Sequence, residues 1–392
     1  MKRLFHSLLI VFLVSAFTGC VDISFPEGDK RMVLVYIAAS ESSLTSYSSG
    51  NVADLLRGHV PKKGSRSEDL LVFIQEHDYK SATTKGDATL KRYYTDSSGD
   101  VAEELIASFG KDFDACTPES LARVLATAES VSRPTVRTLL FSSHGTGWMP
   151  LGYFNGKGEK AKSRKTIGYD CQTKNELDIN DFAIVLGKYH WEALLLDCCY
   201  MGTVEGIYQL RKCCDWVIAS PTEILAQGFP YNCILDQLFL HPGQKGLEAI
   251  CQKYYELYQG QTGDYQSGTI SLTKTDELDN LAGICADIVA LRRTEMEAVN
   301  RLAVQHYFYN NTKDYFFDLA HYFENFATDE QYALLCGQLD KTVPFKKTTA
   351  KFLGLKIDRF SGLSTYIPDP RYTDLNAYYS TLDWNSAVRV IE

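Results

Sequence analysis

A histidine and a cysteine stand near the ends of two apolar runs, and their side chains could carry out nucleophilic catalysis. His144 follows the run 138–143, and Cys199 comes shortly after the run 192–196. A cysteine thiolate is a strong nucleophile, and an imidazole can take up and return a proton near neutral pH. If the two runs are neighbouring parallel strands, both side chains emerge at the same edge of a sheet and form a Cys-His dyad.

Other chemistry-bearing residues fit less well. His190 precedes the strand that Cys199 follows, so we expect it at the opposite end of that strand. A structural role stays the alternative for His144, because an isolated histidine need not be catalytic. The remaining candidates lack the required spacing: Cys198-Cys199 and Cys213-Cys214 for zinc or redox chemistry, Ser142 or Ser143 for a serine hydrolase, and Asp178, Asn180 and Asp181 for calcium, which more simply begin a helix.

The elements around these residues alternate between strands and helices. Apolar residues fall at helical spacing in 117–130 and 178–188, where Thr117, Pro118 and Asp178 have the residue types that begin helices. Continuous apolar runs are typical of strands that are covered on both faces. This alternation predicts an α/β fold whose mainly parallel sheet lies between helices. The five runs are 32–39, 70–75, 138–143, 192–196 and 216–219.

The composition indicates a folded chain that does not bind nucleic acid. Of 392 residues, 45% are hydrophobic, and 40 Lys+Arg against 49 Asp+Glu give a net charge of −9. Without a basic surface, a nucleic-acid partner loses its main electrostatic attraction. We predict an α/β core over 31–242 and a helical C-terminal region over 243–392. In that region we expect 362–368 to form a late strand that returns to the core.

The N-terminus has the pattern of an export signal. Lys2 and Arg3 precede the apolar stretch 8–17, and small residues stand before Cys20 in a pattern similar to a bacterial lipobox. We predict a signal peptide over 1–19, a lipid on Cys20 and a tether over 20–30. The protein would then be an exported lipoprotein of the bacterial cell envelope, on a periplasmic or surface face of the outer membrane, held to the membrane by its acyl chains only. An ordinary secretory signal is the alternative.

Several motifs together resemble the clostripain family of cysteine peptidases, peptidase family C11 in the caspase-like clan. They are His-Gly-x-Gly-Trp at 144–148, Asp-x-Cys-x-Met at 197–201 with the later Glu205, and 219–220 with 228–231, in order along the chain. The resemblance implies a caspase-like sheet sandwiched by helices and a cysteine endopeptidase that acts through a thioacyl-enzyme. By the same resemblance, Cys199 is the nucleophile and His144 the general base and acid. The backbone N–H groups of Gly145 and Cys199 are the expected oxyanion donors.

Specificity rests on fewer residues. Asp197 matches the acidic residue that resembling enzymes place in the primary pocket, which implies cleavage after Arg or Lys. The second acidic position of the family is Gln227 here, and Glu223 is the nearest substitute. A small or uncharged P1 residue therefore stays open as the alternative.

A basic segment between His144 and Cys199 resembles the family's self-cleavage region, although a solvated charged loop is the simpler interpretation. Protein or peptide substrates are the expected partners, and a monomer or a nicked two-chain form is expected. No cofactor is required, and calcium stays open because some relatives bind it. A catalytically silent surface lipoprotein that acts as a binding module is the alternative function. The candidate cut sites are Lys157, Lys160, Lys162, Arg164 and Lys165.

Overall fold

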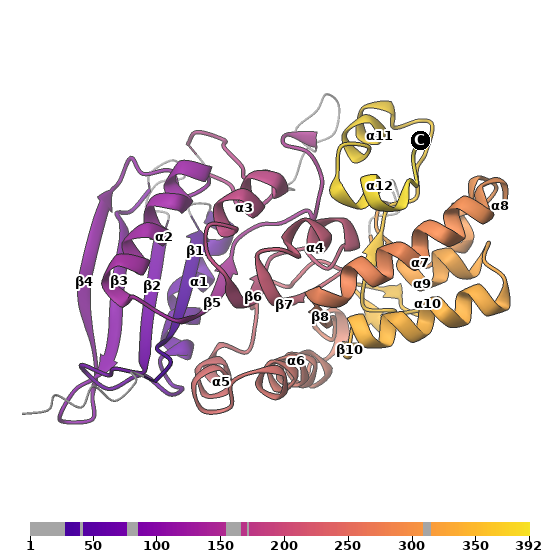
Figure 1. Ribbon diagram of the computed structural model, residues 1–392. Helices are drawn as coiled ribbons and strands as arrows, with labels where there is room; N and C mark the ends of the chain where they lie inside the picture. Colours follow the sequence, from indigo (N-terminus) through magenta and orange to yellow (C-terminus); the bar gives the residue numbers. More distant parts are fainter. Residues whose placement is uncertain (1–27, 40–41, 77–84, 154–165, 171, 309–314) are drawn as a thin grey trace, which may run out of the picture.

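The structure is a computed structural model, and it describes the greater part of the chain (Figure 1). The predicted signal peptide, Cys20 and the basic segment with its five candidate cut sites lie outside the described residues. The described residues are 28–39, 42–76, 85–153, 166–170, 172–308 and 315–392.

Nine strands form one sheet in the order β10-β8-β7-β6-β5-β1-β2-β3-β4. The five strands from β7 to β2 are parallel, and each contains one of the five apolar runs, which confirms the predicted parallel sheet. Antiparallel strands extend both edges. The strands are β1 Arg31–Ala39, β2 Glu68–Glu76, β3 Ala88–Thr95, β4 Val101–Gly110, β5 Val136–Ser142, β6 Trp191–Asp197, β7 Cys214–Ala219, β8 Thr269–Lys274 and β10 Phe345–Thr348.

Helices cover both faces of this sheet, which explains why its central strands are continuously apolar (Figure 1). Alternate residues of β1 enter different cores: Leu34 and Tyr36 pack on one face, and Val33 and Val35 on the other. The first face is covered by α2 Pro118–Ser132, α3 Ile179–Leu186, α4 Val204–Leu210 and α7 Leu278–Leu291, and the second by α1 Ser42–Leu55, α5 Tyr231–Leu235 and α6 Gln244–Gln259.

The predicted helix starts are confirmed by their caps. The Thr117 side chain accepts a hydrogen bond from the N–H of Ser120, and Pro118 occupies the first turn of α2. Asp178 accepts from the N–H of Asn180 at the start of α3. Both side chains satisfy backbone donors that the first helical turn leaves unpaired.

The C-terminal region contributes to the sheet as well as to the helical layer. Its strands β8 and β10 lie beyond β7, so the sheet does not end at residue 242 as the predicted core did. Among the described residues, no helix is long and apolar enough to cross a bilayer. The remaining elements are η2 Asp236–Leu240, η3 Gly263–Tyr265, η4 Thr275–Glu277, α8 Arg293–Glu297, η5 Arg301–Ala303, β9 Phe317–Asp318, α9 Leu319–Glu324, α10 Asp329–Thr342, β11 Lys351–Phe352, β12 Leu355–Lys356, β13 Ser364–Thr365, α11 Thr373–Tyr379 and α12 Asp383–Val388.

The late strand predicted over 362–368 is shorter than expected and does not join the large sheet. Only β13 forms, and it pairs with β9 in a separate two-stranded sheet. The prediction was wrong on this point because the backbone of this segment pairs with β9 and with Thr203 instead. The segment still reaches the core, since the Ser364 N–H donates to the carbonyl oxygen of Gly202 at 2.9 Å.

Glu205 on α4 fastens the C-terminal region to the segment that follows β6. Its side chain is fully buried, and Oε1 accepts hydrogen bonds from the Thr365 hydroxyl at 2.7 Å and the Tyr366 N–H at 2.8 Å. Burial raises the pKa of Glu205 to about 7, although these hydrogen bonds act in the opposite direction. Ionised Glu205 is therefore a cost to the folded state near neutral pH.

This leads to a prediction for the pH dependence of stability. Because the folded pKa of Glu205 lies above the unfolded value, its contribution is fully present below the unfolded pKa and is lost as pH rises through about 7. Glu205→Gln should therefore gain stability relative to the wild type between pH 5 and pH 8, by up to about 3 kcal/mol. Thermal unfolding at both pH values measures this difference. The exposed Glu119→Gln is the control, and curves for Glu205→Gln that stay parallel to the wild type would contradict the assignment.

Candidate active site

The pairing of β5 with β6 brings His144 and Cys199 to one edge of the sheet. The two strands are parallel neighbours, and Ser142 lies opposite Asp197. Each strand ends at that residue, and His144 and Cys199 each follow two positions later. The predicted arrangement of the two strands is thus confirmed, and both side chains are half-buried at its carboxyl edge.

Gly145 lets the two chains approach closely beyond the strands. A Cβ atom added at Gly145 would lie 2.6 Å from the carbonyl oxygen and 3.1 Å from the nitrogen of Cys199. Only glycine fits there without moving the backbone. The residue after His144 therefore packs directly on the backbone of Cys199.

His190 lies at the other end of β6, as expected from its position before the strand. Its Nε2 is 3.0 Å from Oδ1 of Asp215, and both side chains are more than half exposed. It therefore takes no part in the arrangement around Cys199.

The thiol of Cys199 faces a backbone segment that follows β7. The N–H of Ile224 points to Sγ with an N···S distance of 3.3 Å, and the thiol donates to the carbonyl oxygen of Ile224 at 3.7 Å. An N–H donor to sulfur favours the thiolate over the thiol. Cys198, by contrast, is buried with its thiol on the carbonyl oxygen of Phe141, and burial raises its pKa well above the ordinary value. Of the two adjacent cysteines, only Cys199 presents a reactive environment.

Tyr200 makes the sharp turn that presents Cys199. Its φ of +59° is in the left-handed region, which is unusual for an aromatic residue. Three contacts hold it there: its N–H donates to Thr222 at 2.8 Å, its hydroxyl donates to Glu223 at 3.0 Å, and its ring stacks on Phe316 with centroids 4.5 Å apart. Glu223 thus contacts Tyr200, and Phe316 brings the C-terminal region against the residue that follows Cys199.

Asp197 is a buried carboxylate two residues before Cys199, and it is only 6% exposed. Its Oδ2 accepts hydrogen bonds from the Tyr231 hydroxyl at 2.6 Å and the Ser142 hydroxyl at 3.3 Å. Burial raises the pKa of Asp197 to about 6, and the hydrogen bonds offset only part of that rise. Among the described residues, no Lys, Arg or His lies within ion-pair distance of this carboxylate. All its neighbours are therefore neutral donors.

A turn after Ile224 covers this carboxylate. Gly228 has a φ of +71°, and a Cβ atom there would lie 2.6 Å from Oδ2 of Asp197. Its N–H donates to the carbonyl oxygen of Leu225 at 2.8 Å, which closes the turn. Gln227, one residue earlier, is exposed. The residue that approaches Asp197 is thus Gly228, while the Glu223 carboxylate accepts the hydrogen bond from Tyr200.

The described cysteines and acidic residues show no sign of other centres. Within the described ranges, no group of three His, Cys, Asp or Glu side chains could hold a metal ion. The nine cysteines in those ranges form no disulfide with one another, and most of them are buried.

Three contributors to the site were not given these contacts by sequence reasoning, which named Ser142 only as a serine-hydrolase candidate and Tyr231 only within the motif 228–231. The backbone of Ile224, the hydroxyl of Tyr231 and the hydroxyl of Ser142 contact Cys199 or Asp197. Backbone contacts carry no residue signature. Ser142 could have been recognised, because it is the last residue of β5 and faces the same edge as His144.

Fold and site together define a class of protein. A mainly parallel sheet covered by helices, with Cys and His at its carboxyl edge, is the arrangement of caspase-like cysteine peptidases. The model of the clostripain family, Peptidase C11, matches residues 35–340, and the chain belongs to this family. The protein is thus a clostripain-family cysteine peptidase, an enzyme that acts on proteins or peptides.

Solved structures of the same family superpose on almost the whole chain. An inactive zymogen C11 protease from Parabacteroides distasonis is 28% identical, with a TM-score of 0.78 over 92% of this chain and 99% of its own. Iotapain, a secreted C11 cysteine protease from Bacteroides thetaiotaomicron, is 25% identical, with a TM-score of 0.74 over 93% of this chain and 100% of its own. A secreted C11 protease of the same bacterium, bound to an irreversible peptide inhibitor, is 24% identical and has the same fold, with a TM-score of 0.74 over 92% and 98%. No curated protein matches the chain.

The contact between Gly145 and Cys199 can be tested directly. In Gly145→Ala the new Cβ atom must push the backbone of Cys199 away, and a displacement near 1 Å at a reacting group costs on the order of a hundredfold in rate. We expect kcat/KM to fall by that factor in a protein that remains folded by circular dichroism.

Gly283→Ala on α7 is the matched control, because nothing lies within 4 Å of its added Cβ atom. It should keep full activity and unfold at a slightly higher temperature. Unchanged kcat/KM in Gly145→Ala would contradict the close approach.

Proposed function

We propose that the protein is an endopeptidase in which Cys199 is the nucleophile and His144 the general base and acid. The observation that carries this proposal is the register of β5 and β6, which ends both strands level with each other and sets Gly145 on the backbone of Cys199. The N–H of Ile224 on the Cys199 sulfur adds support, because it stabilises a thiolate.

The proposed reaction has two stages. The Cys199 thiolate attacks the carbonyl carbon of the peptide bond, and the N–H groups of Gly145 and Cys199 receive the oxyanion. Protonated His144 gives its proton to the leaving amine as the C–N bond breaks, which leaves a thioacyl-enzyme. His144 then takes a proton from water, the hydroxide displaces the thiolate, and the acid product leaves. The chemistry requires no cofactor.

We propose a preference for Arg or Lys at P1, carried by Asp197. Its carboxylate is surrounded by neutral donors only, so a guanidinium or ammonium would supply the one compensating charge that the site lacks. The rival is a small or uncharged P1 residue. It draws support from Gln227 in place of a second acid and from the raised pKa of Asp197, which leaves part of the carboxyl neutral in mildly acidic solution.

Two further proposals concern processing and location. Self-cleavage after Lys157, Lys160, Lys162, Arg164 or Lys165 would follow from a basic P1 preference and would give a nicked two-chain form. Lipid attachment at Cys20 would tether an exported enzyme to the cell envelope. The secreted relative iotapain supports export, and the sequence before Cys20 supports the lipid.

Peptide cleavage tests the dyad and the pocket together. Protein that begins at Val21, with its Cys199→Ala and His144→Ala variants, is incubated with a diverse peptide mixture, and new termini are identified by mass spectrometry. Cuts after Arg or Lys, and any cuts in the enzyme's own basic segment, should fall by about a thousandfold or more in both variants. Equal activity of wild type and Cys199→Ala would overturn the proposal.

The Asp197→Asn variant distinguishes an effect on substrate binding in the pocket from an effect on the chemical step. It should lower kcat/KM for Arg substrates by about a hundredfold while changing that for Ala substrates less than tenfold, because only the former bind its charge. In the wild type, the Arg-to-Ala ratio should fall by about tenfold per pH unit below pH 6, where Asp197 takes up a proton. Cuts after small residues that do not depend on Asp197 would favour the rival specificity.

Intact mass tests the lipid. Full-length protein extracted from the membrane of an expressing bacterium should exceed the mass of the 20–392 polypeptide by glyceryl and acyl groups. Cys20→Ser should appear without them and be released from the membrane fraction. An unmodified mass for the wild type would end this proposal.

A further inference from the structure

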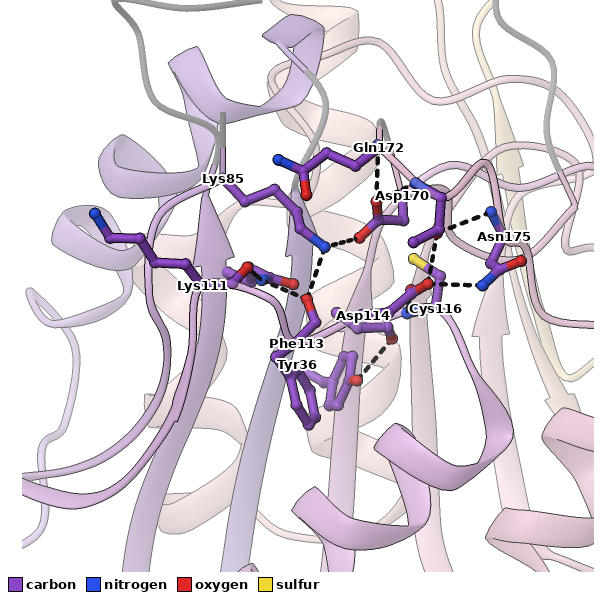
Figure 2. Close-up of polar contacts among 12 residues, drawn as sticks. Tyr36, Lys85, Lys111, Phe113, Asp114, Cys116, Asp170, Gln172 and Asn175 are labelled. Carbon is purple, nitrogen blue, oxygen red and sulfur yellow. Dashed lines mark hydrogen bonds and ion pairs between the residues drawn. The ribbon is translucent and has the colours of Figure 1, made fainter. Parts of the chain in front are cut away.

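A buried ion pair joins Lys85 to Asp170 (Figure 2). Nζ of Lys85 is 2.5 Å from Oδ2 of Asp170, and the two side chains are 1% and 0% exposed. Lys85 comes shortly before β3, and Asp170 follows His144 in the chain. Burial of two charges is costly, so a pair of this kind is retained only where the charges are well bonded.

Lys85 joins two segments through one ammonium group. Besides Asp170, it donates to the carbonyl oxygen of Phe113 at 2.8 Å, which also accepts from the Gln75 side chain at 2.7 Å (Figure 2). The segment of Phe113 continues to Cys116, which packs on Gly168. A Cβ atom added at Gly168 would lie 2.8 Å from the sulfur of Cys116. The ion pair therefore clamps residues 113–116 against the segment that contains Gly168 and Asp170.

Asp170 also shapes the turn of a hairpin between Thr166 and Leu177. Its Oδ1 accepts from the N–H groups of Gln172 and Thr173 at 2.8 and 3.0 Å. At the root of the hairpin, Ile167 and Leu177 exchange two backbone hydrogen bonds of 3.1 and 2.8 Å. One carboxylate thus faces the buried ammonium with one oxygen and organises the turn with the other.

The hairpin holds the backbone of His144. The N–H of Gly168 donates to the carbonyl oxygen of His144 at 3.1 Å. Gly168 has a φ of +76°, and the Cys116 sulfur occupies the place that a side chain at this position would need. A continuous path of contacts runs from Lys85 through Asp170 and the hairpin to the carbonyl group of His144.

We propose that Lys85 and Asp170 are positioning residues for His144, acting through this hairpin on the rate of the chemical step. The inference rests on the proposed dyad, because it gives His144 a role that depends on its position. Loss of either charge leaves the other buried without an opposite charge, and we expect the hairpin to loosen and admit water. The position of His144 relative to Cys199 then varies, and the transfer of a proton from His144 to the leaving amine becomes slower.

The experiment compares this ion pair with a second one, which joins α2 to β5. Asp170→Asn and Lys85→Met are set against Glu129→Gln, which breaks the pair of Glu129 with Arg137 near the start of β5. Unfolding temperature, kcat, KM and amide hydrogen exchange are measured at a temperature where each variant is folded. Both clamp variants should lower kcat at least tenfold with KM within threefold, and exchange should rise at least tenfold within 166–177.

The control should lower the unfolding temperature with unchanged kcat. A merely structural role would move the unfolding temperature but would leave kcat of the folded variants within threefold of the wild type, and that result overturns the proposal. Exchange that rises equally across the whole sheet would also overturn it. If either single variant does not fold, the double variant Lys85→Met/Asp170→Leu takes its place. It buries no charge at this site but still lacks the Asp170 oxygen that accepts the hydrogen bonds of the turn, so it should fold and have a low kcat. Full activity of the double variant would overturn the proposal.

Failure of the dyad itself gives a different result. If His144→Ala kept wild-type activity, the proposed function would be wrong. The exchange measurement would still report whether Lys85 and Asp170 hold the hairpin, because it does not depend on turnover.

Discussion

The parallel register between β5 and β6 is the constraint on which the active site depends. Because Ser142 lies opposite Asp197, β5 and β6 end at the same level of the sheet. His144 and Cys199 each lie two residues beyond the end of their strand. Both strands are buried on both faces, so a slip by one residue would turn every side chain to the wrong face. The packing of the two apolar cores thereby fixes where the backbone of each strand ends, and the residues beyond the strands add only local turns. Gly145 and Tyr200 are those turns, one by lacking a side chain and the other by a backbone conformation that its neighbours hold in place.

Two carboxyl groups near the ends of these strands, Asp197 and Glu205, are buried, and their surroundings differ. Asp197 and Glu205 both have raised pKa values because burial disfavours their charged forms. Asp197 faces neutral donors at the site, where the positive charge of a substrate could compensate it. Glu205 bonds to backbone and side-chain donors of the C-terminal region and thereby joins that region to the nucleophile segment. The Glu205 carboxyl group is bonded within the fold, whereas Asp197 is the carboxylate for which we propose a positively charged ligand.

The C-terminal region is consequently part of the enzyme and not an appendage. It supplies β8 and β10 to the sheet, Phe316 to the ring of Tyr200, and Ser364 to the carbonyl group of Gly202. On the opposite side of the site, Lys85 and Asp170 hold the hairpin that bonds to His144. The segments of Cys199 and His144, the proposed nucleophile and base, are thus each held by a separate part of the chain that is distant in sequence. Such supports matter because a catalytic pair tolerates little displacement.

The sequence by itself determined the central strands, the capped helices α2 and α3, the family and the candidate dyad, because apolar runs, cap residues and short motifs are local patterns. It did not reveal that 362–368 would form only a two-residue strand, since that strand depends on its pairing with β9, which lies far away in the sequence. Nor could it pair Glu223 with Tyr200, Asp197 with Tyr231, or Lys85 with Asp170. These contacts join residues far apart in the chain, and their partners are chosen by burial and by the need to satisfy each buried polar group. Tertiary structure alone decided them, because only the packed fold removes the water that would otherwise serve as the partner.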